Sequence, residues 1–266
     1  MTEPTAASQL SVTVAEIYES RFVPSVFAGW ARALVDAADV GPGDAVLDVG
    51  CGTGIVARTV ADRVPGHGWI VGVDISDGML SVARRLQPDV EWQQGDATRL
   101  LYADEAFDVV LSQAMLMFVP APMDAVREMA RVAKEGGTVA VHVWASLSQQ
   151  RGWGPFHEAI RRHAGPEALD MVSGYWRMGN REAVVKMCTR AGLRVKQAST
   201  VERDAVYRSV EQFVTTEIAG TPLEAALDPG ALQHIMEDTA AGLTRFQRPD
   251  GRLAVPLAGH IVVCRK

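Results

Sequence analysis

Between residues 45 and 143 the sequence alternates short apolar runs with stretches of helical periodicity. Apolar runs predict strands at 45–49, 69–73, 90–93, 107–111 and 138–143. The stretches between them predict helices that end near Val64 and Leu86, and a third at 122–133 closed by Gly136 and Gly137. Short strands joined through helices need crossover connections, which give a largely parallel sheet covered on both faces. The pattern therefore predicts a doubly wound α/β fold.

At 266 residues the chain is long enough to bury one substantial core. We expect one domain over 1–266, with a loose terminus at 1–10, N-terminal helices in 1–40, a ligand-binding core at 41–145 and helical insertions at 145–180 and 204–250. The region 253–264 reads as a strand, with Pro256 at a bend or edge. The insertions are expected to cover the carboxyl ends of the strands, where open α/β sheets bind ligands.

The first strand runs into a glycine-rich turn, VLDVGCGTG, at 46–54. Gly50, Gly52 and Gly54 allow a tight turn and close approach of a ligand. The dinucleotide fingerprint G-x-G-x-x-G/A is matched only from Gly52 and only through Ala57. Asp48 stands just before the glycines, where a carboxylate would repel a pyrophosphate. The turn therefore favours a positively charged ligand over a phosphate.

Acidic residues also follow the next two strands. Asp74 ends the second strand and can accept hydrogen bonds from both ribose hydroxyls of an adenosine-containing cofactor. Asp96 follows the third strand, within reach of the adenine amine. Because the carboxyl ends of parallel strands meet at one edge, Asp48, Asp74 and Asp96 are expected to converge on one crevice. S-adenosylmethionine, which carries an ammonium, a sulfonium and no phosphate, suits such a crevice.

The segments VLDVGCGTG, GVDIS followed by DGML, GDA, FDVVLSQ and EGGTVAV resemble class I S-adenosylmethionine-dependent methyltransferases. The similarity is to the branch of the ubiquinone and menaquinone biosynthesis enzymes, and it covers roughly 25–145. It implies a Rossmann-like, seven-stranded sheet that binds S-adenosylmethionine. By that resemblance, Asp48 and the 50–54 loop, Cys51 included, hold the methionine end, and Asp74 holds the ribose. The resemblance assigns the remaining cofactor contacts to Ile75 and Met79 beside the base, Asp96 and Ala97 at adenine, Ser112 and Gln113 beneath the methionyl group, and Tyr18 from the N-terminal helix.

The acceptor side is less constrained, because a sulfonium already provides a good leaving group and the protein mainly aligns the reactants. His142, near the end of the fifth strand, is the candidate general base, against the alternative of a core histidine. Four residues are candidates for the acceptor pocket: His157, Trp144, Tyr175 and Trp176. The alternative is an exposed helix position for His157 and packing within the lid for the three aromatic residues. The helix that follows Cys51 offers a way to lower its thiol pKa, although a small loop residue is the simpler interpretation. The spacing of His142, His157 and His163 predicts no metal site.

Composition narrows the partners of the chain. A net charge of −6 without a dense basic cluster argues against nucleic acid and favours a small-molecule substrate. We expect no signal peptide, no membrane span and a cytoplasmic location, since the three cysteines are sparse. A nicotinamide-dependent oxidoreductase, a nucleic-acid methyltransferase and a non-catalytic S-adenosylmethionine-binding protein stay open as alternatives. The methylated atom and the oligomeric state are also open.

Overall fold

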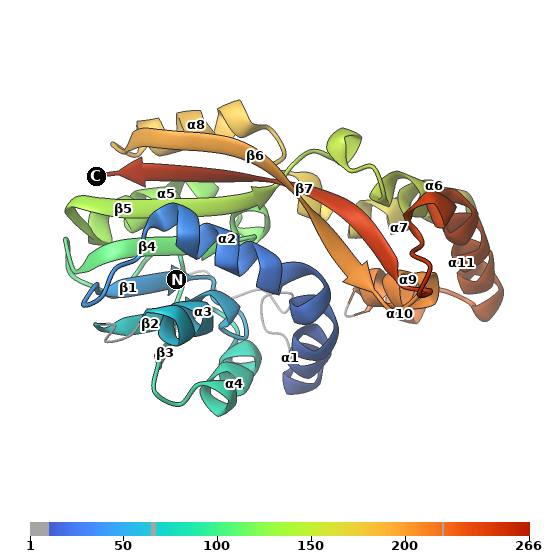
Figure 1. The fold of residues 1–266 in the computed structure, drawn as a ribbon, viewed down its shortest axis with the longest axis horizontal. Coiled ribbons are helices and arrows are strands. Elements are labelled where there is room, and N and C mark those ends of the chain that lie inside the picture. The colour runs from blue at the N-terminus through green and yellow to red at the C-terminus, as the bar shows by residue number, and fades with distance from the viewer. Residues whose placement is uncertain (1–10, 65–67, 220) are drawn as a thin grey trace.

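A seven-stranded mixed sheet organises the part of the chain that the structure describes (Figure 1). The structure is a computed structural model that describes residues 11–64, 68–219 and 221–266, so the expected loose terminus at 1–10 lies outside it. The strands follow the order β3-β2-β1-β4-β5-β7-β6. Their bounds are β1 Val46–Val49, β2 Ile70–Asp74, β3 Glu91–Gln94, β4 Phe107–Gln113, β5 Ala133–Trp144, β6 Arg194–Tyr207 and β7 Leu253–Arg265.

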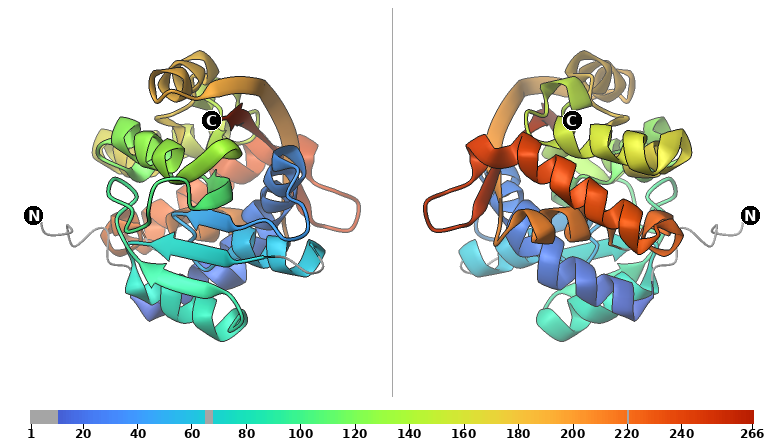
Figure 2. Two further views of the ribbon diagram at one scale, coloured as in Figure 1. Left: turned by 90° about the vertical axis from the view of Figure 1, so that its left-hand side faces the viewer. Right: turned by 90° about the vertical axis from the view of Figure 1, so that its right-hand side faces the viewer.

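The sheet is parallel except for β7, which pairs antiparallel with both β5 and β6. Every residue of β1 is buried, as expected for a strand covered on both faces. Helices lie on both sides of the sheet in the two end-on views (Figure 2). The prediction of a doubly wound, mostly parallel α/β fold is confirmed.

The helices form one group around the sheet and a second group beyond it. The first group comprises α1 Val12–Ile17, α2 Ala28–Ala38, α3 Ile55–Arg63, α4 Asp77–Leu86, α5 Pro122–Val132 and α8 Arg181–Arg190. The second comprises α6 Trp153–His163, α7 Gly165–Val172, α9 Val210–Ile218, α10 Pro222–Ala226 and α11 Pro229–Leu243. Short 3₁₀ turns add η3 Leu116–Phe118, η4 Leu147–Gln149, η5 Gly174–Trp176 and η6 Thr244–Phe246.

The second group, which we call the lid, lies at the carboxyl end of β5 (Figure 1). Trp144 at the end of β5 pairs with Gly259 of β7, so the 253–258 part of β7 extends past β5 and stays paired with β6. The helices α6 and α9 begin close to this extension, and α11 packs against both. Pro256 lies in the extension, where the missing N–H faces no partner from β5.

The N-terminal segment departs from a regular helix. Tyr18–Phe27 forms a π-helix, η2, between α1 and α2, and it contains Pro24. Proline lacks the N–H that a helix interior requires, and wider turns of this kind are frequent at functional sites. Sequence periodicity predicted helices in 1–40 but did not distinguish the π-helical part.

The amino-terminal part of β5 also differs from expectation. The strand already begins at Ala133, so Gly136 and Gly137 do not close the preceding helix but lie inside the strand. A Cβ on Gly137 would lie 2.8 Å from the Lys134 carbonyl oxygen and 3.0 Å from that of Asp108. The β4–β5 register shifts between Phe107 and Val109, and glycine is needed there for close approach of the backbone.

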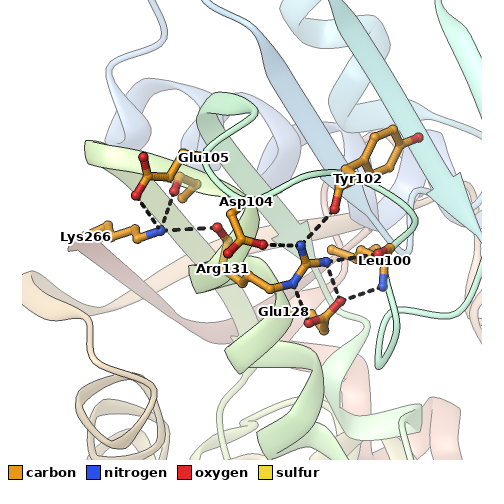
Figure 3. Close-up of polar contacts among 8 residues, drawn as sticks. Leu100, Tyr102, Asp104, Glu105, Glu128, Arg131 and Lys266 are labelled. Atoms are coloured by element: carbon orange, nitrogen blue, oxygen red, sulfur yellow. Dashed lines mark hydrogen bonds and ion pairs between the residues drawn. The ribbon is translucent and has the colours of Figure 1, made fainter.

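A polar cluster fixes the loop before β4 to α5, at the amino ends of the strands and away from the lid (Figure 3). The Arg131 guanidinium donates to both carboxylate oxygens of Glu128, each at 2.7 Å, and to Asp104 at 2.8 Å. It also donates to the carbonyl oxygens of Leu100 and Tyr102. Bidentate, charge-assisted contacts of this kind hold a loop in one geometry.

Candidate functional site

Asp48 of β1 lies just before the glycine-rich turn and is bonded to the start of α3, the helix that follows this turn. Asp48 is 1% exposed, and its Oδ2 accepts a hydrogen bond of 3.1 Å from the Ala57 N–H in the first turn of α3. Its Oδ1 is buried and has no hydrogen-bond partner among the described residues. Burial raises the pKa of Asp48 to about 7, and the nearby charge of Asp74 adds to the rise. The unpartnered oxygen suits a cationic donor.

Asp74 binds the same turn from the end of β2. Its Oδ2 accepts from the Gly52 N–H and its Oδ1 from the Ser76 N–H, both at 2.8 Å. Burial raises the pKa of Asp74, while these two hydrogen bonds oppose the rise. Each carboxylate oxygen still has a free lone pair, so Asp74 can accept further hydrogen bonds from a diol.

The backbone N–H groups of the turn are used within the protein. Those of Gly50 and Cys51 donate to the Val73 carbonyl oxygen at 2.8 and 3.0 Å, and that of Gly54 donates to the Cys51 carbonyl oxygen at 2.8 Å. The Gly52 N–H is held by Asp74. A dinucleotide site needs such N–H groups to bind pyrophosphate. These four donors already have protein acceptors, so the turn is a poor cradle for phosphate.

The three glycines share a left-handed backbone, with φ of +70°, +56° and +88° at Gly50, Gly52 and Gly54. A Cβ at Gly50 would collide with the Met115 side chain, and one at Gly54 with the Trp92 ring. These two glycines are therefore required by packing within the protein as well as by backbone conformation. We expected these glycines to admit a ligand. That Met115 and Trp92 pack against them was not predictable, because the sequence pattern does not pair residues so far apart in the chain.

Tyr18 of η2 lies over the turn. Its hydroxyl would be 4.0 Å from a Cβ on Gly52, and its ring stacks near Phe22 and Phe27 with centroids at 5.9 and 5.1 Å. Burial raises the pKa of Tyr18, with smaller contributions from the charges of Asp74 and Asp48. The structure thus brings Tyr18 to the same crevice as the two acids, as the resemblance implied.

The polar residues at the end of β4 hold neighbouring backbone. Ser112 Oγ donates to the Val49 carbonyl oxygen at 2.9 Å, and Gln113 Nε2 donates to that of Phe27 at 3.2 Å. The Gln113 Oε1 atom is buried without a partner among the described residues. Ser112 and Gln113 therefore tie β4 to β1 and to η2, which places this strand end beside the glycine turn.

The residues expected around the base lie along the edge beyond Asp74. Met79 is buried and packs against Tyr18, while Ile75 and Ala97 are partly exposed. Asp96 is exposed, and its Oδ1 accepts from both the N–H and the hydroxyl of Thr98 at 2.8 Å. Asp96 lies at the same sheet edge as Asp48 and Asp74, but this oxygen is directed to its own turn.

Cys51 does not follow the expected electrostatic pattern. The thiol is 6% exposed, and burial raises its pKa well above the usual value, with the charges of Asp74 and Asp48 adding to the effect. The suggestion that the following helix lowers this pKa was wrong, because burial and the charges of two carboxylates dominate. Cys51 is a small loop residue and not a nucleophile.

His142 is enclosed in the core and does not face the crevice. It is 1% exposed, with its ring 4.5 Å from those of both Trp30 and Trp144. A Cβ on Gly259 would lie 2.5 Å from its Nε2, and neither ring nitrogen has a partner among the described residues. Burial lowers the pKa of His142 to about 3. These surroundings do not support its assignment as general base, because no proton donor reaches it.

His157 has both ring nitrogens engaged within the lid. Its Nδ1 lies 2.9 Å from the Trp153 carbonyl oxygen, and its Nε2 accepts from the Trp176 Nε1–H at 3.1 Å. Burial lowers the pKa of His157, so the neutral ring donates through Nδ1. This histidine orients Trp176 and is not free to take a proton.

Two of the aromatic candidates differ in burial: Trp144 is buried and Tyr175 is partly exposed. Trp144 is 3% exposed and packs against Phe27 and Trp30, so it belongs to the core. Tyr175 is partly exposed, and its ring meets the ring of Phe118 edge-on at 5.5 Å, just after β4. Tyr175 therefore lies where the lid meets the carboxyl ends of the strands, and Trp144 does not line that space.

One buried acid of the lid, Glu217, was missed from the sequence. It shares an apolar face of α9 with Val210 and Phe213 and is 6% exposed. The signal in the sequence was a single charge within an apolar stripe of helical spacing. A stripe does not show what packs against it, so its partners were not predictable.

Two further observations concern the described ranges of the chain. They include no group of three or more His, Cys, Asp or Glu residues placed to hold a metal ion. Within the same ranges, every helix is too short or too polar to cross a bilayer.

Comparison with known proteins agrees with this geometry. Residues 47–141 match the family described as methyltransferase domain. By this match, residues 47–141 form a methyltransferase domain. A demethylmenaquinone methyltransferase of Renibacterium salmoninarum is 43% identical over 112 residues, which cover 42% of this chain and 46% of that relative. The match thus spans less than half the length of this relative.

Solved structures share the fold of the methyltransferase domain at low identity. Phosphoethanolamine N-methyltransferase 2 of Haemonchus contortus, in complex with S-adenosylhomocysteine, is 19% identical with a TM-score of 0.60 and covers 96% of this chain and 57% of its own. The [4+2]-cyclase SpnF is 21% identical with a TM-score of 0.56 and covers 90% of this chain and 80% of its own. Because a cyclase also has this fold, the fold by itself does not determine the reaction.

Proposed function

We propose that this chain transfers the methyl group of S-adenosylmethionine to a small organic acceptor. One observation carries the proposal: the Asp74 carboxylate holds the glycine turn, the buried Asp48 lies just before it, and four N–H groups of the turn are already bonded within the protein. A phosphate-bearing dinucleotide would find two negative charges and few free donors there. A cationic adenosine derivative would find complementary charge.

The residues of the crevice fit the parts of S-adenosylmethionine. The unpartnered Oδ1 of Asp48 suits the ammonium group, and the remaining lone pairs of Asp74 suit the ribose diol. Ile75 and Met79 would contact the base, with Asp96 and Ala97 at its edge. Tyr18 would cover the methionine end from η2, and the sulfonium supplies an activated methyl group when bound.

For the acceptor, we propose an aromatic molecule that carries hydroxyl groups. The relative from Renibacterium is a demethylmenaquinone methyltransferase, and the partly exposed Tyr175 offers an aromatic surface at the lid. The net charge of −6 argues against nucleic acid as acceptor. All three cysteines are free, which supports a reducing compartment such as the cytoplasm.

Thermal unfolding with different ligands tests the cofactor assignment. S-adenosylhomocysteine at 100 times its Kd should stabilise the folded protein by about 2.7 kcal/mol, which raises the Tm by roughly 5 to 10 °C in a chain of this size. NADH at the same concentration should leave the Tm unchanged. Stabilisation by NADH without stabilisation by S-adenosylhomocysteine would show that the assignment is wrong. Release of S-adenosylhomocysteine from S-adenosylmethionine with an acceptor would then separate an enzyme from a non-catalytic binder.

A further inference from the structure

A polar cavity lies beside the start of α8, away from the glycine turn. It has a volume of about 510 Å³, and residues of the loop after η5, of α8, of β6 and of β7 line it. The helix α8 packs against β6 (Figure 1), and β4 and β5 separate β6 and β7 from β1. Sites for small molecules have volumes of this order, and most of the lining side chains are polar. The cavity is therefore a candidate site for a polar ligand other than the cofactor.

Two arginines give this cavity a positive charge. Arg177, in the loop before α8, is exposed, and its side chain has no ion pair among the described residues. Arg181, the first residue of α8, donates to the Glu182 carboxylate at 3.0 Å and to the Thr200 hydroxyl at 3.5 Å. The side chain of Asn180 already caps the first turn of α8. The arginines, and not the start of the helix, therefore make the cavity attractive to an anion.

Glu182 is the acidic side chain that lines the cavity. It is 66% exposed and its partner Arg181 is 39% exposed, so water screens this ion pair and the pair contributes little to stability. A doubly charged oxyanion can displace the Glu182 carboxylate, because its several oxygens form charge-assisted, bidentate hydrogen bonds with a guanidinium group. Arg177 would then balance the second charge of the anion.

His260 of β7 connects the cavity with a proton. The residue is 2% exposed, its Nε2 lies 3.1 Å from the Gly179 carbonyl oxygen, and its Nδ1 lies 3.0 Å from the Thr200 hydroxyl oxygen. Because a carbonyl oxygen only accepts, Nε2 carries a hydrogen, and Nδ1 of the neutral ring accepts from the Thr200 hydroxyl. A protonated ring donates to Thr200 through Nδ1, which frees the hydroxyl hydrogen for a ligand. Proton uptake by His260 thus adds one positive charge and one donor to the cavity.

The groups around His260 favour its neutral form in the free protein. Burial lowers the pKa of His260, and the bond to Gly179 opposes this shift. On α8, the charge of Arg181 lowers the pKa further, whereas that of Glu182 raises it. On β5, the buried His142 has a pKa of about 3 and is uncharged near neutral pH. An anion in the cavity stabilises the protonated ring, so the anion and a proton should bind together.

We propose that this cavity binds a small molecule that carries a phosphate group. The phosphate oxygens accept hydrogen bonds from the guanidinium groups of Arg177 and Arg181. The Thr200 hydroxyl donates to the same group once His260 has taken up a proton. Trp176 of η5 also lines the cavity and is bonded to α6, so the ligand lies beside the lid. The site does not depend on the proposed methyl transfer, because S-adenosylmethionine carries no phosphate.

Isothermal titration calorimetry of the full chain tests this site. Sulfate is the first probe, because it stays doubly charged between pH 5 and pH 8, and sodium chloride at the same ionic strength is the reference. Arg177→Gln and Arg181→Gln should each weaken sulfate binding by about 10- to 100-fold, the range for a hydrogen bond to a charged group. Arg190→Gln is the matched control and should leave the Kd unchanged, since it removes the same charge from the exposed far end of α8.

Glu182→Gln should change the affinity in the opposite direction. This variant removes the acid that competes for Arg181, so sulfate should bind about 2- to 5-fold more tightly, which is the value of an exposed ion pair. Inorganic phosphate and glycerol 3-phosphate are then compared at one pH. Tighter binding of the ester would identify a phosphate monoester as the ligand, and equal binding would identify the free anion; both results support the site.

The pH dependence tests the part played by His260. Since sulfate does not titrate in this range, its affinity should rise by about 3- to 10-fold from pH 8 to pH 5.5, the value of one hydrogen bond. Titrations at pH 6 in buffers of different ionisation enthalpy should show proton uptake on binding. His260→Gln should abolish both effects. The exposed Thr200→Val variant should reduce the rise in affinity, and it keeps the test valid if His260→Gln does not fold.

Several results would overturn the inference: no saturable binding of sulfate or phosphate beyond that of chloride, an equal loss in Arg190→Gln, weaker binding by Glu182→Gln, or no proton uptake. Saturation with S-adenosylhomocysteine should leave the Kd for sulfate unchanged. Competition between the two ligands would show that the anion binds in the cofactor crevice and not beside α8. Failure of S-adenosylhomocysteine to bind would contradict the proposed function and leave this site unaffected.

Discussion

Replacing Asp48 by Asn tests whether the cofactor crevice is kept at a cost in stability. Burial raises the pKa of Asp48 from 3.8 to about 7 in the folded protein. Between these values the folded state holds a proton that the unfolded state has lost, so the free energy of unfolding falls as the pH rises and the loss is complete above about pH 7. At 1.36 kcal/mol per pH unit, the displacement corresponds to about 4 kcal/mol, of which roughly 2.5 kcal/mol falls between pH 5 and pH 8.

The Asp48→Asn side chain does not titrate but keeps an oxygen that can accept the Ala57 N–H. Urea unfolding of both proteins at pH 5, 6.5 and 8 measures the effect. Relative to the wild type, the variant should become more stable by roughly 2.5 kcal/mol between pH 5 and pH 8. Asp77→Asn, an exposed acid at the start of α4, is the control and should run parallel to the wild type.

The same variant should lose affinity for S-adenosylhomocysteine at pH 8, because the ammonium group loses its counter-charge. Stability and binding should thus change in opposite directions at one pH. Parallel pH curves for wild type and Asp48→Asn would refute the reasoning, since they would show that Asp48 titrates normally in the folded chain. A gain in stability with unchanged ligand affinity would confirm the burial cost and contradict the assignment of Asp48 to the ammonium group.

Three further substitutions test the remaining geometry. Asp74→Ala removes the acceptor of two backbone N–H groups and of the proposed ribose contacts. Calorimetry should therefore show the Kd for S-adenosylhomocysteine rising about 100-fold or more, and a rise below about 3-fold would contradict this. Gly54→Ala adds a collision with the Trp92 ring to a strained φ and should lower the free energy of unfolding by about 3 kcal/mol. Gly192→Ala is the control, because Gly192 has the same φ of +88° but open space around it. This variant should lower the free energy of unfolding by only about 1 kcal/mol. Arg131→Ala should cost about 2 kcal/mol in urea unfolding against less than about 0.5 for the exposed Arg127→Ala, and equal losses would show that the cluster is not cooperative.

Local patterns were sufficient to predict the core of the fold. The β1 run is apolar because both faces of a central parallel strand are covered, and its buried residues confirm that interpretation. Asn180 and Asp228, residue types that favour helix starts, cap α8 and α11 and accept hydrogen bonds of 2.9 Å from the Ala183 and Ala231 N–H groups. These features depend on residues close together in the chain, so the sequence carries them directly.

Features that depend on distant partners were not predictable in the same way. His142 looked like a base because a polar residue ends a strand, but Trp30 from α2 and Gly259 from β7 enclose it. Asp96 shows the opposite case, because one of its oxygens closes a local turn with Thr98 while the residue stays proposed at the edge of the base. Only the tertiary arrangement shows whether a polar side chain faces a crevice, a neighbour or its own backbone.

Most of the site residues that the sequence predicted lie on the proposed cofactor side, whereas the contacts within the lid were not predicted. Apart from Tyr18, the residues proposed for the cofactor side lie within 47–141, the part that matches the methyltransferase domain family, close to strand ends that any such sheet provides. The lid lies outside that match, and there α6, α9 and β6 bring Trp153, Glu217 and Tyr207 together. On the proposed function, substitutions in the lid should therefore change the choice of acceptor while binding of S-adenosylhomocysteine stays constant.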